Sequence, residues 1–322
     1  MVDTVRARSR LYKALALVVL LVIAILLPLV LKSNYQLGIA HQALIFIILA
    51  LGYDVLLGFT GLLSFGHIGL FAIGAYTSAI LVMSTGAPFL VGLLGAAVLT
   101  GFIGFLIAIP ALRIKGHYLT LLTLALGEVI RLVIRSADSL THGSSGLSGI
   151  PRPDIFGYSF RQATPLYYLL LFFAVLAILF VWRLKISRFG RAFMSIRDAE
   201  IGAEVCGVNT SAMKMMSFAI SAVLAGIAGS LYAHTMRFIS PEFFGLGLTT
   251  TLLAMVLIGG RGTVVGPVVG AALLIVLPEA LRFVKDYYLI VFGIAIWLCV
   301  IGMPDGLAGL GRRLLKRARL IA

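Results

Sequence analysis

Long runs of hydrophobic residues, separated by short polar segments, occupy most of this chain. A helix needs roughly 20 apolar residues to cross a bilayer, and several runs reach that length. The runs lack the period-two alternation of a transmembrane barrel. The pattern therefore predicts an all-α, polytopic membrane helix bundle. The ten candidate spans are residues 11–31, 38–57, 62–83, 89–109, 117–135, 165–182, 213–236, 246–260, 264–281 and 287–303.

Two of these spans are less regular than the others. The span at 62–83 begins in a glycine-rich stretch, so the pattern leaves open whether it crosses fully or is re-entrant. The span at 246–260 is short for a crossing. Composition agrees with a membrane protein, because 61% of the residues are hydrophobic and only 12% are charged.

The distribution of positive charge predicts the orientation of the bundle. The formal net charge of +14 could suggest a nucleic-acid partner, but the cations lie at span ends and in loops. With the N-terminus inside, eighteen Lys and Arg residues fall on inside segments and six on outside segments. This bias predicts that both termini are cytoplasmic. The basic start followed by the long run at 11–31 favours a retained first helix over a cleaved signal peptide.

Two polar segments interrupt the spans. Residues 136–164 are rich in Gly, Ser and Pro, which predicts a periplasmic loop with turns and no separate domain. Residues 183–212 lie on the cytoplasmic side in this topology and carry charges of both signs. We expect residues 1–322 to form one transmembrane domain in a bacterial inner membrane, in contact with lipid.

The segment 190–207 is the most charged part of the second polar region. Ser195 with Asp198 three residues later is a plausible N-cap for a short helix, and Gly207 is a natural end. Such a small-residue helix suits a groove on another protein. The residues alone leave docking and a plain solvated loop equally open. The acidic residues of this segment are Asp198, Glu200 and Glu204.

A second group of small residues surrounds His67 in residues 58–76. Ionisable groups at membrane depth are candidates for function, but a histidine packed against a neighbouring carbonyl is at least as good an interpretation. No cluster of ligands accompanies His67, so we predict no metal site. The glycines here also resemble those of 259–270, which leaves open an internal repeat of the kind found in transporters.

The third group lies in residues 117–135. Glu128 and Arg131 are three residues apart and share a helical face, which predicts an ion pair. A structural clamp between helices is favoured over a substrate contact. Thr120 and Thr123 could hydrogen-bond across the bundle. The candidate residues for a translocation path or gate are Ser64, Gly66, His67, Thr120, Thr123 and Glu128.

Other acidic residues and the missing motifs complete the picture. Asp54 and Glu279 are near span ends, where we expect them to be solvated or capping. The sequence has no Gly-x-x-x-x-Gly-Lys-Ser/Thr nucleotide motif and no clustered catalytic set. We therefore expect no cofactor in this chain, with any ATP bound by partner subunits. A stand-alone secondary carrier remains an alternative, although it would need midspan carboxylates that are almost absent.

Four blocks of sequence resemble one known family. They are residues 57–81, 115–153, 190–236 and 240–274. The chain resembles the permeases of bacterial branched-chain amino-acid ABC importers over most of 38–303. The loop ending Gly-Leu-Ser-Gly-Ile-Pro-Arg-Pro is similar to the M-type subunit rather than the companion H-type subunit.

This resemblance implies a mechanism and partners. Family members pair with a second permease subunit and two ATPase subunits, and a periplasmic binding protein delivers the substrate. Relatives that import urea, short-chain amides or other amino acids share the motifs, so the substrate stays open. The resemblance implies an ATPase-docking coupling helix that contains Asp198, Ala199, Glu200, Gly202, Ala203, Glu204 and Gly207.

Overall fold

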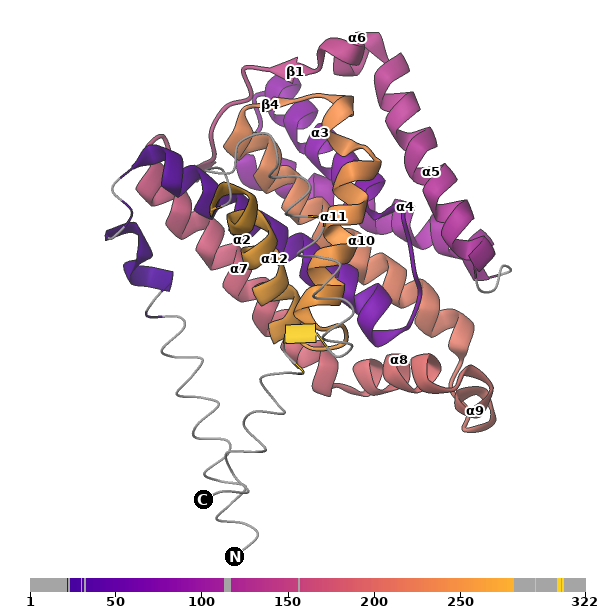
Figure 1. Cartoon of the computed structure of the whole chain (residues 1–322). Coiled ribbons are helices and arrows are strands. Elements are labelled where there is room, and N and C mark those ends of the chain that lie inside the picture. The colour runs from indigo at the N-terminus through magenta and orange to yellow at the C-terminus, as the bar shows by residue number, and fades with distance from the viewer. Residues whose placement is uncertain are drawn as a thin grey trace, which may run out of the picture.

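The protein is a nearly all-α bundle in a computed structural model, which describes residues 33–112, 117–155 and 157–280 together with isolated positions in 22–31 and 293–309. Figure 1 shows the helices packed side by side, with α8 lying across one end. The longer helices are α2 (Asn34–Asp54), α3 (His67–Thr85), α4 (Phe89–Leu112), α5 (His117–Ser136), α7 (Ala163–Ile186), α8 (Arg188–Asp198), α10 (Thr210–Met236), α11 (Leu246–Gly259) and α12 (Val265–Ala280).

Short elements join these helices. Their bounds are η1 (Val55–Phe59), α6 (Asp138–Thr141), η2 (Gly143–Ser145), β1 (Leu147–Ser148), β2 (Asp154–Ile155), β3 (Tyr158–Ser159), α9 (Glu200–Val205), β4 (Phe238–Ile239) and η3 (Pro241–Phe244). Strand β1 pairs with β4 and β2 pairs with β3, both antiparallel. The π-helical turn η1 continues α2 directly.

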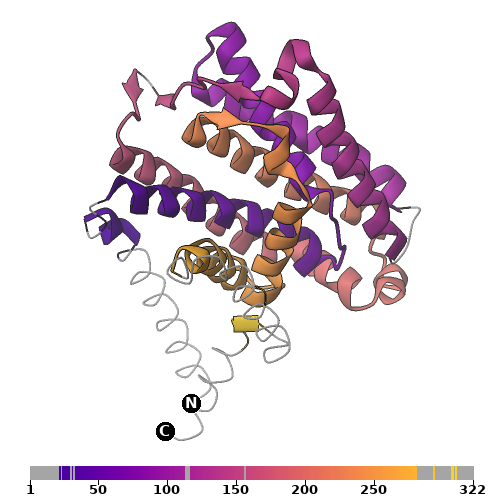
Figure 2. The same ribbon diagram turned by 45° about the horizontal axis from the view of Figure 1, so that its top comes forward.

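Helix α2 forms the centre of the bundle. It is apolar on all sides, and nearly every residue from Leu44 to Asp54 is buried. A helix that is hydrophobic all round is expected in the interior of a bundle. Figure 2 shows α2 running beside α7, with α12 next to it, and α2 also packs against α10 and α11.

Small residues allow α3, α4 and α10 to approach closely. A Cβ on Gly74 would lie 2.5 Å from the Cα of Gly226, and one on Gly229 would lie 2.2 Å from the carbonyl oxygen of Phe71. Such contacts replace side-chain packing with backbone packing, as is common between membrane helices. A side chain at these glycines would therefore push α3 and α10 apart.

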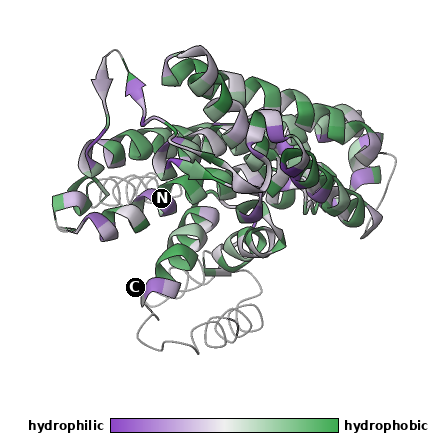
Figure 3. Ribbon diagram, turned by 90° about the horizontal axis from the view of Figure 1, so that it is seen from above, coloured by the Kyte–Doolittle hydropathy of each residue, from purple (hydrophilic) through white to green (hydrophobic). Residues whose placement is uncertain are grey.

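Five of the described helical segments are long and apolar enough to cross a membrane. They are Asn34–Phe59, His67–Thr85, Phe89–Pro110, Ala163–Ile186 and Thr210–Met236. Helices α11 and α12 are apolar but shorter. Figure 3 shows the hydrophobic colour along most of the helices and hydrophilic colour on the β2–β3 hairpin. The chain is thus a multi-pass membrane protein by length and composition.

The observed helices differ from the predicted spans at one boundary. The span at 62–83 begins late, because residues 61–66 are non-helical and α3 begins at His67. Gly61 adopts a left-handed φ of 74°, which ends the preceding helical turn. The predicted spans 11–31 and 287–303 fall largely outside the described residues.

Two ends of the bundle carry the polar segments. The α6–β4 end holds α6, β1, β4 and η3, and the α8–α9 end holds α8 and α9 at the opposite end of the molecule (Figure 1). The predicted loop 136–164 therefore contains one short helix, one 3-10 turn and three two-residue strands. The predicted charged segment lies on the α8–α9 end.

Candidate functional site

The charged segment forms two helices at the α8–α9 end. Helix α8 begins after Ser187, whose side chain accepts a hydrogen bond from the backbone N–H of Gly190. The prediction that Ser195 caps a helix is wrong, because Ser195 lies inside α8 and its hydroxyl donates to the carbonyl of Ala192. Ser187 takes that role because it is the first polar residue after the apolar α7.

Ala199 separates α8 from α9. Its extended φ of −160° breaks the helix and redirects the chain. Two hydrogen bonds then fix α9 on α10: Lys214 Nζ donates to Glu200 Oε1 at 2.6 Å, and Thr210 Oγ1 donates to Glu204 Oε1 at 2.7 Å. The acidic side chains therefore hold α9 in place as well as giving it charge.

The outer face of α9 is apolar and exposed. The side chains of Ile201 and Val205, one helical turn apart, are 78% and 84% exposed. Gly207 follows with a left-handed φ of 82°, as expected for a helix end. Exposed aliphatic residues at a polar end of the bundle indicate a contact surface. Sequence reasoning chose mainly the acidic and small residues of this element.

Asp54 is the clearest residue that sequence reasoning misjudged. It is fully buried, although its position near a span end suggested solvation. Its Oδ1 accepts a hydrogen bond from the backbone N–H of Gly262 at 2.7 Å. Among the described residues, Oδ2 has no hydrogen-bond partner. The signal available in the sequence was an aspartate at the end of an apolar run, just before a glycine-rich turn.

The segment 61–66 brings several candidate path residues together. The backbone N–H of Phe65 donates to Thr123 Oγ1 at 3.0 Å, and a Cβ on Gly66 would lie 2.5 Å from the Thr123 carbonyl oxygen. Ser64 beside them is buried. Thr123 thus bonds across the bundle as predicted, and its hydroxyl also donates to the Thr120 carbonyl.

His67 begins α3 and is buried. Its Nδ1 lies 3.5 Å from Ser221 Oγ, and its ring packs against that of Tyr53 at 5.2 Å between centroids. The hydroxyl of Ser221 donates to the carbonyl of Gly52 at 2.7 Å, which leaves Ser221 Oγ able to accept a hydrogen bond from the Nδ1–H of His67. Nε2 has no hydrogen-bond partner within the described part of the chain. The contact is with a hydroxyl rather than the predicted carbonyl.

Glu128 lies apart from that group. It forms a short ion pair with Arg131, and its side chain is 41% exposed in this single chain. Arg131 also contacts Glu242 of η3 at 3.3 Å. Arg131 therefore links α5 to η3, which is the geometry of a clamp between elements.

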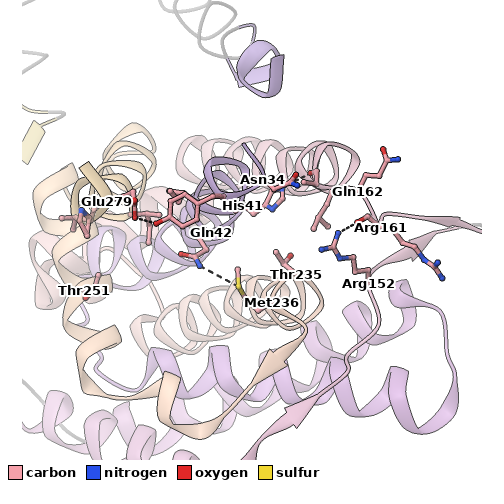
Figure 4. A pocket seen from close by; sticks show the side chains of 18 residues that line it. Asn34, His41, Gln42, Arg152, Arg161, Gln162, Thr235, Met236, Thr251 and Glu279 are labelled. Atoms are coloured by element: carbon pink, nitrogen blue, oxygen red, sulfur yellow. Dashed lines mark hydrogen bonds between the residues drawn. The ribbon is translucent and has the colours of Figure 1, made fainter. Parts of the chain in front are cut away.

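A cavity of about 1380 Å³ opens at the α6–β4 end between α2, α7, α10, α11 and α12. Figure 4 shows Glu279 on one side and Arg152 on the other, and the Tyr35 hydroxyl donates a hydrogen bond to Glu279. Sequence reasoning missed this cavity because its walls come from five helices and a loop. The polar side chains that line it include Asn34, His41, Gln42, Arg161, Gln162, Thr235 and Thr251.

Within the described ranges, no group of three or more His, Cys, Asp or Glu residues is arranged to hold a metal ion. The geometry instead offers a contact surface at one end, an open cavity at the other, and tight glycine packing between them. This arrangement suits a membrane component that works with other proteins.

Comparison with known proteins agrees with this description. The family model for "branched-chain amino acid transport system / permease component" matches residues 35–300. The chain is 34% identical to the high-affinity branched-chain amino acid transport system permease protein LivM of Salmonella typhimurium, over 96% of this chain and 78% of that protein. LivM of Escherichia coli is also 34% identical over the same shares.

A second type of permease matches more weakly. LivH of Escherichia coli, another permease protein of the high-affinity branched-chain amino acid transport system, is 26% identical over 81% of this chain and 90% of its own length. No solved structure matches the chain. The family match and the likeness to LivM each cover most of the sequence. The chain therefore belongs to the family of permease components of branched-chain amino acid transport systems.

Proposed function

We propose that this chain is a membrane permease subunit of an ATP-driven importer of branched-chain or related amino acids. The family membership and the 34% identity to LivM over 96% of the chain support this function. The observation that carries the ATP-driven part is the exposed apolar face of α9, at Ile201 and Val205. Such a face on a polar end of the bundle is suited to a groove on a partner protein.

The docking element comprises α9 and the residues beside it. Its two exposed aliphatic side chains contact the partner. The hydrogen bonds from Lys214 and Thr210 hold α9 against α10 when the partner moves. The partner is an ATPase subunit, which binds the ATP for which this chain has no motif. The residues assigned to docking are Asp198, Ala199, Glu200, Gly202, Ala203, Glu204 and Gly207, with Ile201 and Val205 added.

The proposed assembly contains this chain, an H-type permease subunit, two ATPase subunits and a periplasmic binding protein. Residues 1–322 form one domain that crosses a bacterial inner membrane ten times with both termini in the cytoplasm. Loop 136–164 then faces the periplasm and segment 183–212 faces the ATPases. The open cavity at the α6–β4 end faces the binding protein in this orientation.

The substrate path is proposed along the contact between the 61–66 segment and α5. Ser64, Gly66, His67, Thr120 and Thr123 contribute to it, and the close backbone approach of Gly66 to Thr123 supports a gate at this point. Glu128 lies nearer the other end of α5, where the Arg131 pair supports a structural role.

Reconstitution tests the function. The chain alone in liposomes is expected to take up no leucine, whereas the complex with its second permease, ATPases and binding protein takes it up only with ATP. Urea and acetamide in parallel reactions test the alternative substrates. Leucine uptake by the purified chain without ATP would contradict the proposal.

Docking has its own variant. Val205→Arg places a charge in the proposed contact, so ATPase co-purification should fall about tenfold or more, as for a binding hot spot. Arg188→Gln, an exposed change at the start of α8, is the matched control and should retain the ATPases. Equal co-purification of both variants would remove α9 from the docking surface.

A further inference from the structure

Arg197 lies in the last turn of α8, next to the docking segment, and contacts the bundle at η1. Its Nη1 donates to the backbone carbonyl of Gly58 at 2.8 Å, while Nε donates to Asp198 Oδ1 at 2.9 Å. The guanidinium group thus joins the residue next to α9 with the π-helical turn that ends α2. The planar fork of arginine is suited to two such partners at once.

The turn at Gly58 is in contact with a second glycine turn. A Cβ on Gly58 would lie 2.4 Å from the backbone nitrogen of Gly262, and one on Gly262 would lie 2.8 Å from Arg197 Nη1. Gly61 completes the group, because its Cβ would lie 3.0 Å from Arg197 Cγ. Arg197 therefore rests on two turns that belong to different helix pairs, α2–α3 and α11–α12.

The second turn is held from both sides. Its Gly262 N–H donates to Asp54 of α2, and its carbonyl accepts from Lys185 Nζ of α7 at 2.5 Å. Lys185 lies near the end of α7, just before α8, and Arg197 lies in the last turn of α8, so residues on both sides of α8 contact these turns. A displacement of α9 that also moves Asp198 therefore acts on the contacts of Arg197 with these turns.

We propose that Arg197 is the positioning residue through which movement of the docking segment reaches the membrane helices, by way of the glycine turns at Gly58 and Gly262. This inference rests on the proposed ATPase docking at α9. It goes beyond docking because it names the contact through which movement of α9 reaches the membrane helices. Arg197 itself touches neither nucleotide nor substrate in this scheme.

The absence of side chains at the glycine turns allows Arg197 to lie against both of them. A Cβ on Gly262 would lie 2.8 Å from Arg197 Nη1, and one on Gly61 would lie 3.0 Å from Arg197 Cγ, so a side chain at either glycine would displace Arg197. Arg197 is partly exposed, with about a third of its side chain accessible (34%), so its contacts can rearrange without unfolding the bundle. Coupling between distant sites requires an element with two arrangements, and in this proposal the Arg197 contacts have that role.

The test is the ratio of leucine uptake to ATP hydrolysis in the full reconstituted complex. Arg197→Gln should leave the ATPases bound and basal hydrolysis intact, but lower uptake per ATP about tenfold, a typical coupling effect. Arg197→Lys keeps the charge and the stem over Gly61 but cannot bind Gly58 and Asp198 together. It should fall between Arg197→Gln and the unmodified complex. Arg188→Gln is the control on the same helix.

The outcomes separate the two proposals. An unmodified complex that shows no ATP-dependent uptake contradicts the proposed function. If that complex transports and Arg197→Gln keeps the same uptake per ATP, the coupling role is overturned. Loss of ATPase binding or of complex stability in parallel with uptake, in both Arg197→Gln and Arg197→Lys, also overturns it, since the residue is then structural.

Discussion

The two ends of the bundle are both held by buried polar contacts, but the chemistry differs. At the α8–α9 end, the charged side chains of Asp54 and Arg197 bind backbone groups of glycine turns. At the α6–β4 end, His234 Nδ1 donates to the Pro151 carbonyl at 2.7 Å, and its Nε2 pairs with Ser78 Oγ at 3.0 Å. Charges hold the first end, and a histidine–serine network holds the second.

The two ends of the bundle also differ in how tightly they are packed. Glycine backbones at the α8–α9 end approach so closely that a single Cβ would collide. The α6–β4 end also has close contacts, since a Cβ on Gly146 would lie 2.2 Å from the carbonyl oxygen of Ile239, but it contains a cavity of about 1380 Å³ beside them. Close-packed elements transmit displacement, whereas an open cavity can change shape. We therefore expect the α8–α9 end to transmit displacement more directly than the α6–β4 end, whose cavity can change shape.

The largest expected effect comes from adding one methyl group at each end of α2. In Gly58→Ala, the Cβ would lie 1.9 Å from Asp54 Oδ1, so the turn must shift. Overpacking of this kind costs about 1–3 kcal/mol. In Gly38→Ala, nothing lies within 4 Å of the new Cβ, and alanine favours the helix by up to about 1 kcal/mol. Thermal unfolding of the purified chain in detergent should therefore separate the two variants.

The pair also tests the comparison. If both variants unfold at the temperature of the unmodified protein, the α8–α9 end is not tightly packed. If Gly38→Ala is the more damaging change, the contrast between the two ends is reversed.

The next effect, over a similar range of free energy but without a backbone collision, is expected at Asp54. Asp54→Ala leaves the buried Gly262 N–H without its acceptor, and an unsatisfied buried donor costs about 1–3 kcal/mol. Asp54→Asn keeps one oxygen that can accept from Gly262 and replaces the other carboxylate oxygen by an NH2 group, so its unfolding temperature should lie closer to that of the unmodified protein than that of Asp54→Ala. Equal losses for both variants would show that the charge, rather than the hydrogen bond, stabilises the turn.

Much of the helical architecture could be predicted from hydrophobic runs. The runs at 89–109 and 213–236 lie within the described helices α4 and α10. Length and apolar composition decide these elements, because a membrane helix satisfies its own backbone. The end of a helix in glycine-rich sequence was less predictable, as at 62–83. There a left-handed Gly61 and a hydrogen bond from Phe65 to Thr123 determine where α3 begins.

The site was predictable only where it was local in sequence. The charged segment around α9 stood out because it interrupts hydrophobic sequence. Asp54 was misjudged because its partner, Gly262, is 208 residues away and offers only a backbone N–H. In the sequence, Arg197 and Lys185 served only as positive charges that indicate the cytoplasmic side. Their partners are the backbone carbonyls of Gly58 and Gly262, which no side-chain pattern marks. A hydrogen bond to a backbone group can involve any residue type, so the sequence does not reveal it.

The smallest expected effect concerns the ion pairs of Glu242 at the α6–β4 end. Glu242 Oε2 lies 3.3 Å from Arg131, but its side chain is 61% exposed. Pairs so exposed contribute roughly 0–1 kcal/mol and are screened by salt. Glu242→Gln should therefore lower the unfolding temperature slightly at low salt and not at all in 1 M salt, where the Debye length is about 3 Å. A loss as large as that of Asp54→Ala, persisting in high salt, would mean that the α6–β4 end is held as firmly as the α8–α9 end. The structural difference between the two ends would then not be a difference in stability.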